Sequence, residues 1–92
     1  MATILKSDGT RVKTNPKNKN HFLAKELNDI VDGYLEIIGL PIEKTLMVVD
    51  EDGKRKEKPV NTEATRLFRQ NFPHNGDYIV GDVLICGQRE IK

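Results

Sequence analysis

Apolar residues recur at helical spacing in the segment that follows residue 20. Charged and polar residues lie between them, as expected for a helix with one buried face. We expect Asn20 to be the N-cap of this helix and Gly33 to stop it after Asp32. The buried stripe is formed by Leu23, Leu27, Ile30 and Val31.

A second helix is predicted after the sequence Pro59-Val60-Asn61. Asn61 or Thr62 is suited to the N-cap position, because a short polar side chain can accept a hydrogen bond from the first turn. Pro73 and the turn at residues 74–77 end the helix. Its buried stripe consists of Ala64, Leu67 and Phe68.

The remaining apolar runs have the length and the β-branched composition of strands. Residues 3–6 and 11–14 predict a hairpin around the Asp8-Gly9 turn, at a polar edge of the sheet. Residues 45–49 form a continuous apolar run, which predicts an inner strand buried on both faces. Further strands are expected at residues 34–38, 78–80 and 83–86, with a bulge or tight bend at Gly81-Asp82.

This order of elements, ββαββαβ with or without an eighth element, predicts an α+β domain. We expect a largely antiparallel sheet with both helices on one face. The 92 residues form a single domain, in which residues 1–19 are an N-terminal hairpin and loop.

Composition narrows the classes of function. With 15 Lys+Arg against 14 Asp+Glu, the net charge of +1 provides no field for an extended nucleic acid. The 5% aromatic content, without Trp, argues against a stacking platform for single strands. The first residues lack the pattern of a secretory signal, and no apolar run is long enough for a membrane span. The single cysteine cannot form an internal disulfide. We therefore expect a cytoplasmic protein.

The residues that could carry catalysis do not form a persuasive set. Cys86 lies in an apolar strand, where a free thiol packs as a small hydrophobe. His21 and His74 lie near helix boundaries, and the acidic residues 50–52 lack the spacing of a calcium loop. One cysteine and two distant histidines cannot complete a zinc site. We therefore expect no enzyme, no metal and no cofactor.

Four sequence blocks carry a resemblance to a known family. They are Val31-Asp32-Gly33-Tyr34-Leu35-Glu36, Val49-Asp50-Glu51-Asp52-Gly53-Lys54, Asn61-Thr62-Glu63-Ala64-Thr65 and the closing segment 77–85. In this order they resemble the family catalogued as domain of unknown function 3846, known mainly from phages, plasmids and other mobile elements. The resemblance covers about Leu23 to Gly87 and leaves the N-terminal hairpin outside. It implies a genomic setting and no catalytic residue.

Two surfaces are candidates for binding. Backbone N–H groups, hydroxyls and guanidinium groups at the second helix could converge on a phosphate, and the alternative is plain capping with a solvated helix face. The residues concerned are Asn61, Thr62, Thr65, Arg66 and Arg69. The N-terminal third is locally basic, with Lys13, Lys17, Lys19 and Lys25, which suits either a solvated loop or a phosphate-binding arm.

Three functions follow from these features. The leading hypothesis is a non-enzymatic phage or mobile-element protein that counters host defence by sequestering a phosphate-bearing nucleotide such as a cyclic oligonucleotide. We expect it to be a homo-oligomer, because small domains often form ligand pockets between subunits. The second hypothesis is a protein-protein inhibitor or accessory factor that docks on a host or phage enzyme through a strand edge or helix face. The third is a nucleic-acid-binding regulator.

Overall fold

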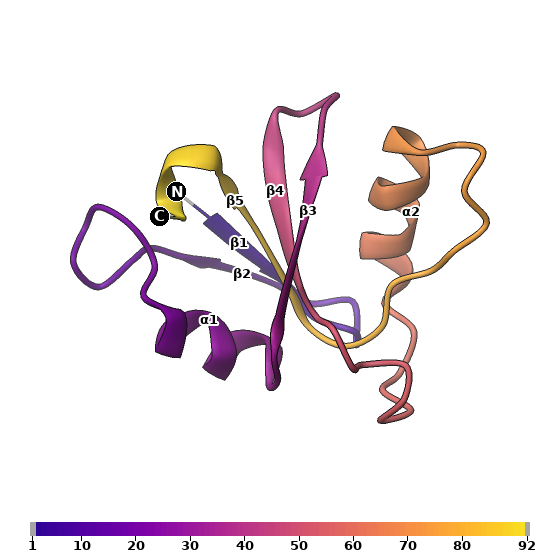
Figure 1. The fold of residues 1–92 in the computed structure, drawn as a ribbon, viewed down its shortest axis with the longest axis horizontal. Helices are drawn as coiled ribbons and strands as arrows, with labels where there is room; N and C mark the ends of the chain where they lie inside the picture. The colour runs from indigo at the N-terminus through magenta and orange to yellow at the C-terminus, as the bar shows by residue number, and fades with distance from the viewer. Residues whose placement is uncertain (1, 92) are drawn as a thin grey trace.

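A single five-stranded sheet organises the computed structural model, which describes residues 2–91 (Figure 1). The strands are β1 (Ala2–Leu5), β2 (Arg11–Thr14), β3 (Leu35–Leu40), β4 (Thr45–Asp50) and β5 (Val83–Gly87). Their spatial order is β2-β1-β5-β4-β3, and every neighbouring pair is antiparallel. The predicted α+β class and the order ββαββαβ are confirmed. None of the helices within residues 2–91 is long and apolar enough to cross a membrane.

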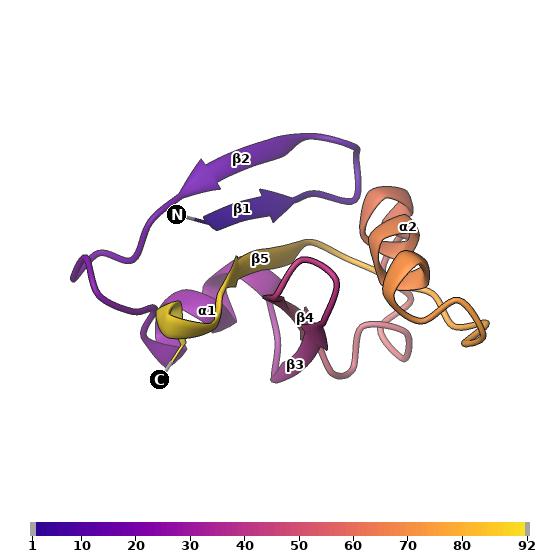
Figure 2. The same ribbon diagram turned by 90° about the horizontal axis from the view of Figure 1, so that it is seen from above.

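The helices α1 (Ala24–Val31) and α2 (Thr62–Asn71) lie on opposite faces of the sheet, as Figures 1 and 2 show. Val48 of β4 packs in one cluster with Leu27 of α1, whereas its neighbour Met47 packs in another with Phe68 of α2. The prediction of both helices on one face is therefore wrong. Neighbouring residues of a strand point to opposite faces, so a strand that is apolar on both faces needs a cover on each.

The inner strand and the hairpin agree with the sequence prediction. Met47 and Val48 are fully buried in β4, as expected for a strand covered on both faces. In the hairpin, Gly9 has a φ of 93°, a left-handed conformation that glycine adopts without steric cost. β2 forms one edge of the sheet, and β1 also pairs with β5, so the hairpin is part of the main sheet.

The start of α1 differs from the prediction. Leu23, not Asn20, occupies the N-cap position. The Glu26 carboxylate accepts hydrogen bonds from the Leu23 N–H at 2.9 Å and the Lys17 N–H at 3.1 Å, and these bonds lower the pKa of Glu26. Asn20 lies in a turn instead, in which its N–H donates to the Asn18 side chain. At the other end, Asp32 takes the left-handed C-cap conformation immediately before Gly33.

Asn61 joins α2 to the rest of the fold. Its side-chain oxygen accepts from the Ala64 N–H at 3.0 Å, so the predicted N-cap is confirmed. Its amide nitrogen donates to the carbonyl of Leu5 at 2.9 Å and to that of Gly81 at 2.8 Å. The side chain is buried, and this one amide therefore connects α2 with the end of β1 and with the segment before β5.

The expected strand at residues 78–80 does not form. Ile79 bonds to the start of α2: its N–H donates to Thr65 Oγ1 at 2.9 Å, and its carbonyl accepts from the Asn61 N–H at 2.8 Å. Val80 makes an isolated bridge with Val60. The expected bend is present, because Gly81 has a φ of 74°. The Thr65 hydroxyl and the main-chain N–H of Asn61 thus replace a neighbouring strand as hydrogen-bond partners of Ile79.

We expect Asn61→Ala to lower the free energy of unfolding by about 3 kcal/mol, because it removes the cap and two buried hydrogen bonds to the carbonyls of Leu5 and Gly81. Urea denaturation measures the loss. The control is Thr62→Ala, since Thr62 is exposed in the next position and its replacement should cost less than about 0.5 kcal/mol. A loss below about 1 kcal/mol for Asn61→Ala would contradict this role.

Candidate functional site

The five residues predicted to bind an anion do not face one point. Asn61 and Thr65 are buried, whereas Thr62, Arg66 and Arg69 are exposed. The Thr65 hydroxyl accepts from the Ile79 N–H and lies 3.3 Å from the Ile79 carbonyl. Together with the three hydrogen bonds of Asn61, this contact means that both buried side chains are committed to the interior of the fold.

Each of the exposed arginines already contacts a polar group of the protein. Arg66 Nη2 lies 2.9 Å from the Glu63 carboxylate, which also pairs with Arg11 of β2. Arg69 Nε donates to the Asp77 carbonyl at 3.2 Å. Glu63 thus places a carboxylate in the first turn of α2, where a bound phosphate would otherwise benefit from the helix dipole. Anion binding on this face stays a prediction, now resting on Thr62, Arg66 and Arg69.

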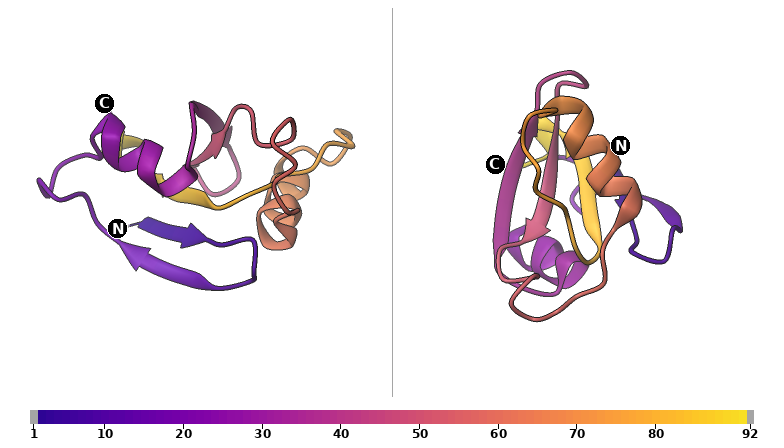
Figure 3. Two further views of the ribbon diagram at one scale, coloured as in Figure 1. Left: turned by 90° about the horizontal axis from the view of Figure 1, so that it is seen from below. Right: turned by 90° about the vertical axis from the view of Figure 1, so that its right-hand side faces the viewer.

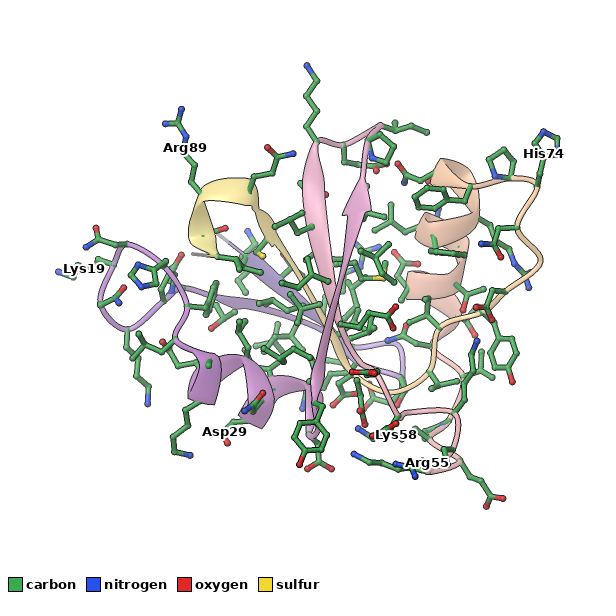
Figure 4. All side chains as sticks on the ribbon, in the orientation of Figure 1. Lys19, Asp29, Arg55, Lys58, His74 and Arg89 are labelled. Atoms are coloured by element: carbon green, nitrogen blue, oxygen red, sulfur yellow. The ribbon has the colours of Figure 1, made fainter. Side chains whose placement is uncertain are left out.

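Cys86 packs in the core, as expected. It is buried against α1, and this burial raises the pKa of its thiol to about 11. Within residues 2–91, no group of three or more His, Cys, Asp or Glu side chains is arranged to hold a metal ion. His74 lies in an exposed turn, at the opposite side of the molecule from the Lys19 loop in Figure 4.

Asp50, the first of the acidic residues 50–52, is a buried residue at the end of β4. Its side chain is only 1% exposed, and its carboxylate lies 2.9 Å from Lys56 Nζ and 2.8 Å from Lys58 Nζ. It also accepts from the Asp52 N–H at 2.9 Å. Burial raises the pKa of Asp50, but the hydrogen bonds from the two lysines outweigh it and hold the pKa at about 2.

The two lysines also bind the end of α1. Lys58 Nζ donates to the carbonyls of Val31 at 2.7 Å and Asp32 at 3.0 Å, and Lys56 Nζ donates to the Asp32 carbonyl at 3.1 Å. Cations are favoured there, because the last carbonyls of a helix lack partners and carry its negative dipole end. Figure 3 (right) shows α1 and residues 51–58 at the same end of the sheet.

Two glycines permit this close approach. A Cβ on Gly33 would lie 2.4 Å from the Asp50 carboxylate, and one on Gly81 would lie 2.8 Å from Lys58 Cδ. We call the cluster of Asp50, Lys56, Lys58 and Gly33, with the carbonyls of Val31 and Asp32, the Asp50 junction. Lys58, labelled in Figure 4, lies at the lower end of the molecule in that view.

The four blocks of family resemblance meet in this part of the structure. The block at 31–36 supplies the end of α1 and Gly33, and the block at 49–54 supplies Asp50. The block at 61–65 holds residues 79–81 through Asn61 and Thr65. Their buried polar residues therefore serve the fold, and only their exposed residues are available to form a functional surface.

The outer edge of β3 is an open apolar feature of the sheet. β3 lies at the end of the strand order, opposite β2, and pairs only with β4 among the described residues. Glu36 is its one charged residue. Ile37 is 47% exposed, and Tyr34 and Ile42 at either end of the strand are 74% and 64% exposed. We call Leu35–Leu40 with these flanking residues the β3 edge.

A cavity of about 310 Å³ lies beside the β3 edge, on the face that carries α2. Glu36 and Ile38 of β3 line it, together with Glu51 and the segment around Tyr78. Lys54 pairs with Asp77 and lies 4.4 Å from the centre of the Tyr78 ring. The side-chain hydrogen bond from Lys54 lowers the pKa of Asp77. The β3 edge and the polar cavity thus share one side of the molecule.

The pKa of Asp50 predicts how stability changes in acid. Its folded pKa of about 2 lies below the ordinary 3.8, so the stabilisation is present at neutral pH and is lost as the pH falls from about 4 towards 2. The loss amounts to about 2 kcal/mol. Urea denaturation between about pH 2 and pH 7 should show a shallower decline for Asp50→Asn than for the wild type. Parallel curves would contradict this assignment.

Comparison with known proteins places the chain in a family. A family model, the domain of unknown function DUF3846, matches residues 1–91. The match includes the N-terminal hairpin, which the four blocks alone left outside. No curated protein and no solved structure shows significant similarity to the chain. The chain, with its buried Asp50 junction and its open β3 edge, belongs to the DUF3846 family.

Proposed function

We propose that the protein is a non-enzymatic binding protein that takes up an extended segment of a partner protein at the β3 edge. The unpaired, apolar edge of β3 carries this proposal. An added strand gains main-chain hydrogen bonds from the N–H and C=O groups of such an edge. The opposite edge strand, β2, carries Arg11 and Lys13, charges of the kind that protect an edge from pairing.

The cavity supplies a means of discrimination between partners. Strand addition takes its affinity from the main chain and its specificity from pockets for alternate side chains. Glu36 and Ile38 belong to β3 and also line the cavity, so alternate side chains of an added strand would lie next to it. Because Glu36 and Glu51 are acidic, a basic side chain suits this position.

The geometry favours this function over nucleotide sequestration. Asn61 and Thr65, which were expected to help bind a phosphate, have their polar atoms engaged in the fold. Glu63 adds a negative charge to the same helix start. The family resemblance implies only a phage or mobile-element setting. The hypothesis of a counter-defence role is kept within the proposal: the partner would be a host or phage enzyme.

Ile37→Lys should abolish partner binding, because it places a charge in the middle of the β3 edge. The matched control is Val12→Lys on the opposite edge strand, since Val12 is also half-exposed, at 39%. Each immobilised variant is exposed to host lysate, and retained proteins are quantified by mass spectrometry. We expect at least one protein to be retained about tenfold more by the wild type and Val12→Lys than by Ile37→Lys.

Circular dichroism and the unfolding midpoint establish that both variants are folded. Equal retention of the same proteins by Ile37→Lys would contradict the proposal. So would calorimetric binding of a cyclic oligonucleotide that is lost in Arg66→Ala and Arg69→Ala but kept in Ile37→Lys, because that result would move the function to α2.

A further inference from the structure

We infer that, in the absence of another partner, the β3 edge pairs with the β3 edge of a second copy of this chain to form a symmetric dimer. The inference rests on the proposed function, because it names an occupant for the same edge. A strand that lies at the end of a sheet exposes a row of main-chain donors and acceptors, and another copy of that strand is a ready partner.

The arrangement of the fold leaves room for this pairing. In Figure 2 no described segment is drawn beyond β3 on its outer side, while α1 and α2 lie on the two faces of the sheet. A two-fold axis perpendicular to the sheet would place two β3 strands antiparallel and would join the two sheets into one. Each helix would then lie on the same face as its counterpart.

The sequence of β3 suits self-pairing in this geometry. An axis through Ile37 places Ile37 opposite Ile37, so two half-exposed apolar side chains would cover each other. The same axis places Glu36 opposite Ile38 and Tyr34 opposite Leu40. The only charged residue of the strand therefore never faces its own copy.

The opposite edge cannot pair with itself in the same way. An axis through Val12 would place Arg11 opposite Lys13, and an axis through Lys13 would place two lysines opposite each other. Like charges directly across a strand pair are destabilising. Arg11 is also held against Glu63 of α2. Of the two edges, only β3 is free of such repulsion.

Sedimentation equilibrium of the full chain tests the inference across a range of about 1 to 100 µM protein. The wild type and Val12→Lys should approach twice the 10.5 kDa monomer mass, whereas Ile37→Lys should stay at the monomer mass. A wild type that is monomeric throughout would overturn the inference. Loss of the dimer in Val12→Lys, or growth beyond a dimer, would also overturn it, because both indicate that β2 takes part in the contact.

Cross-linking tests the register without a charge in the strand. In a Cys86→Ser background, Ile37→Cys should form a covalent dimer on mild oxidation, because directly opposite residues of an antiparallel pair are close enough for a disulfide. Val12→Cys is the control and should remain uncross-linked. Equal cross-linking at both positions, or none at residue 37, would overturn the proposed pairing.

The two proposals fail in different ways. A monomeric wild type whose partner binding is lost in Ile37→Lys would remove the dimer and leave the proposed function intact. A dimer that dissociates in Ile37→Lys while the lysate proteins are still retained would remove the proposed function and leave the dimer intact.

Discussion

The buried carboxylate of Asp50 is the constraint on which the surrounding structure depends. An isolated charge inside a protein is strongly unfavourable, so Asp50 requires cations beside it. Lys56 and Lys58 meet this need only if residues 51–58 turn back towards β4. The same ammonium groups bind the last carbonyls of α1, so one cluster sets the turn, the end of β4 and the end of the helix together.

This cluster, together with Asn61, determines which surfaces stay open. The Asp50 junction holds α1 against one face of the sheet, and Asn61 anchors α2, which covers the other. Both helices pack against the faces of the sheet, and among the described residues no further strand pairs with the outer side of β3. The buried polar residues of the resemblance blocks thus build a scaffold, and the β3 edge is where we propose that the scaffold meets its partners.

Local patterns in the sequence were enough to predict most elements. The Asp8-Gly9 turn, the apolar run of β4 and the cap at Asn61 each depend on neighbouring residues, and each is confirmed. The side of the sheet that a helix covers is set by contacts distant in sequence, and so are the bonds that keep residues 78–80 from forming a strand. These could not be derived from local patterns.

The candidate site illustrates the same limit. Asp50 resembles a solvated turn residue, and Lys56 resembles part of a solvated basic stretch, until the fold brings them together. Asn61 and Thr65 were predicted to bind an anion, but their side chains form hydrogen bonds within the fold. A strand edge was expected as a docking surface, but the sequence did not show which strand would form it. The order of strands in a sheet cannot be read from any single segment of the sequence.

A double-mutant cycle between Asp50→Ala and Lys58→Met tests the central role of the junction most directly. The single variants and the double variant are unfolded in urea, and the coupling free energy is taken from the three losses. We expect a coupling of about 2 kcal/mol, because removing one partner leaves the other charge buried. A coupling near zero, with losses that simply add, would show that the two side chains are neighbours without mutual dependence and would contradict the account.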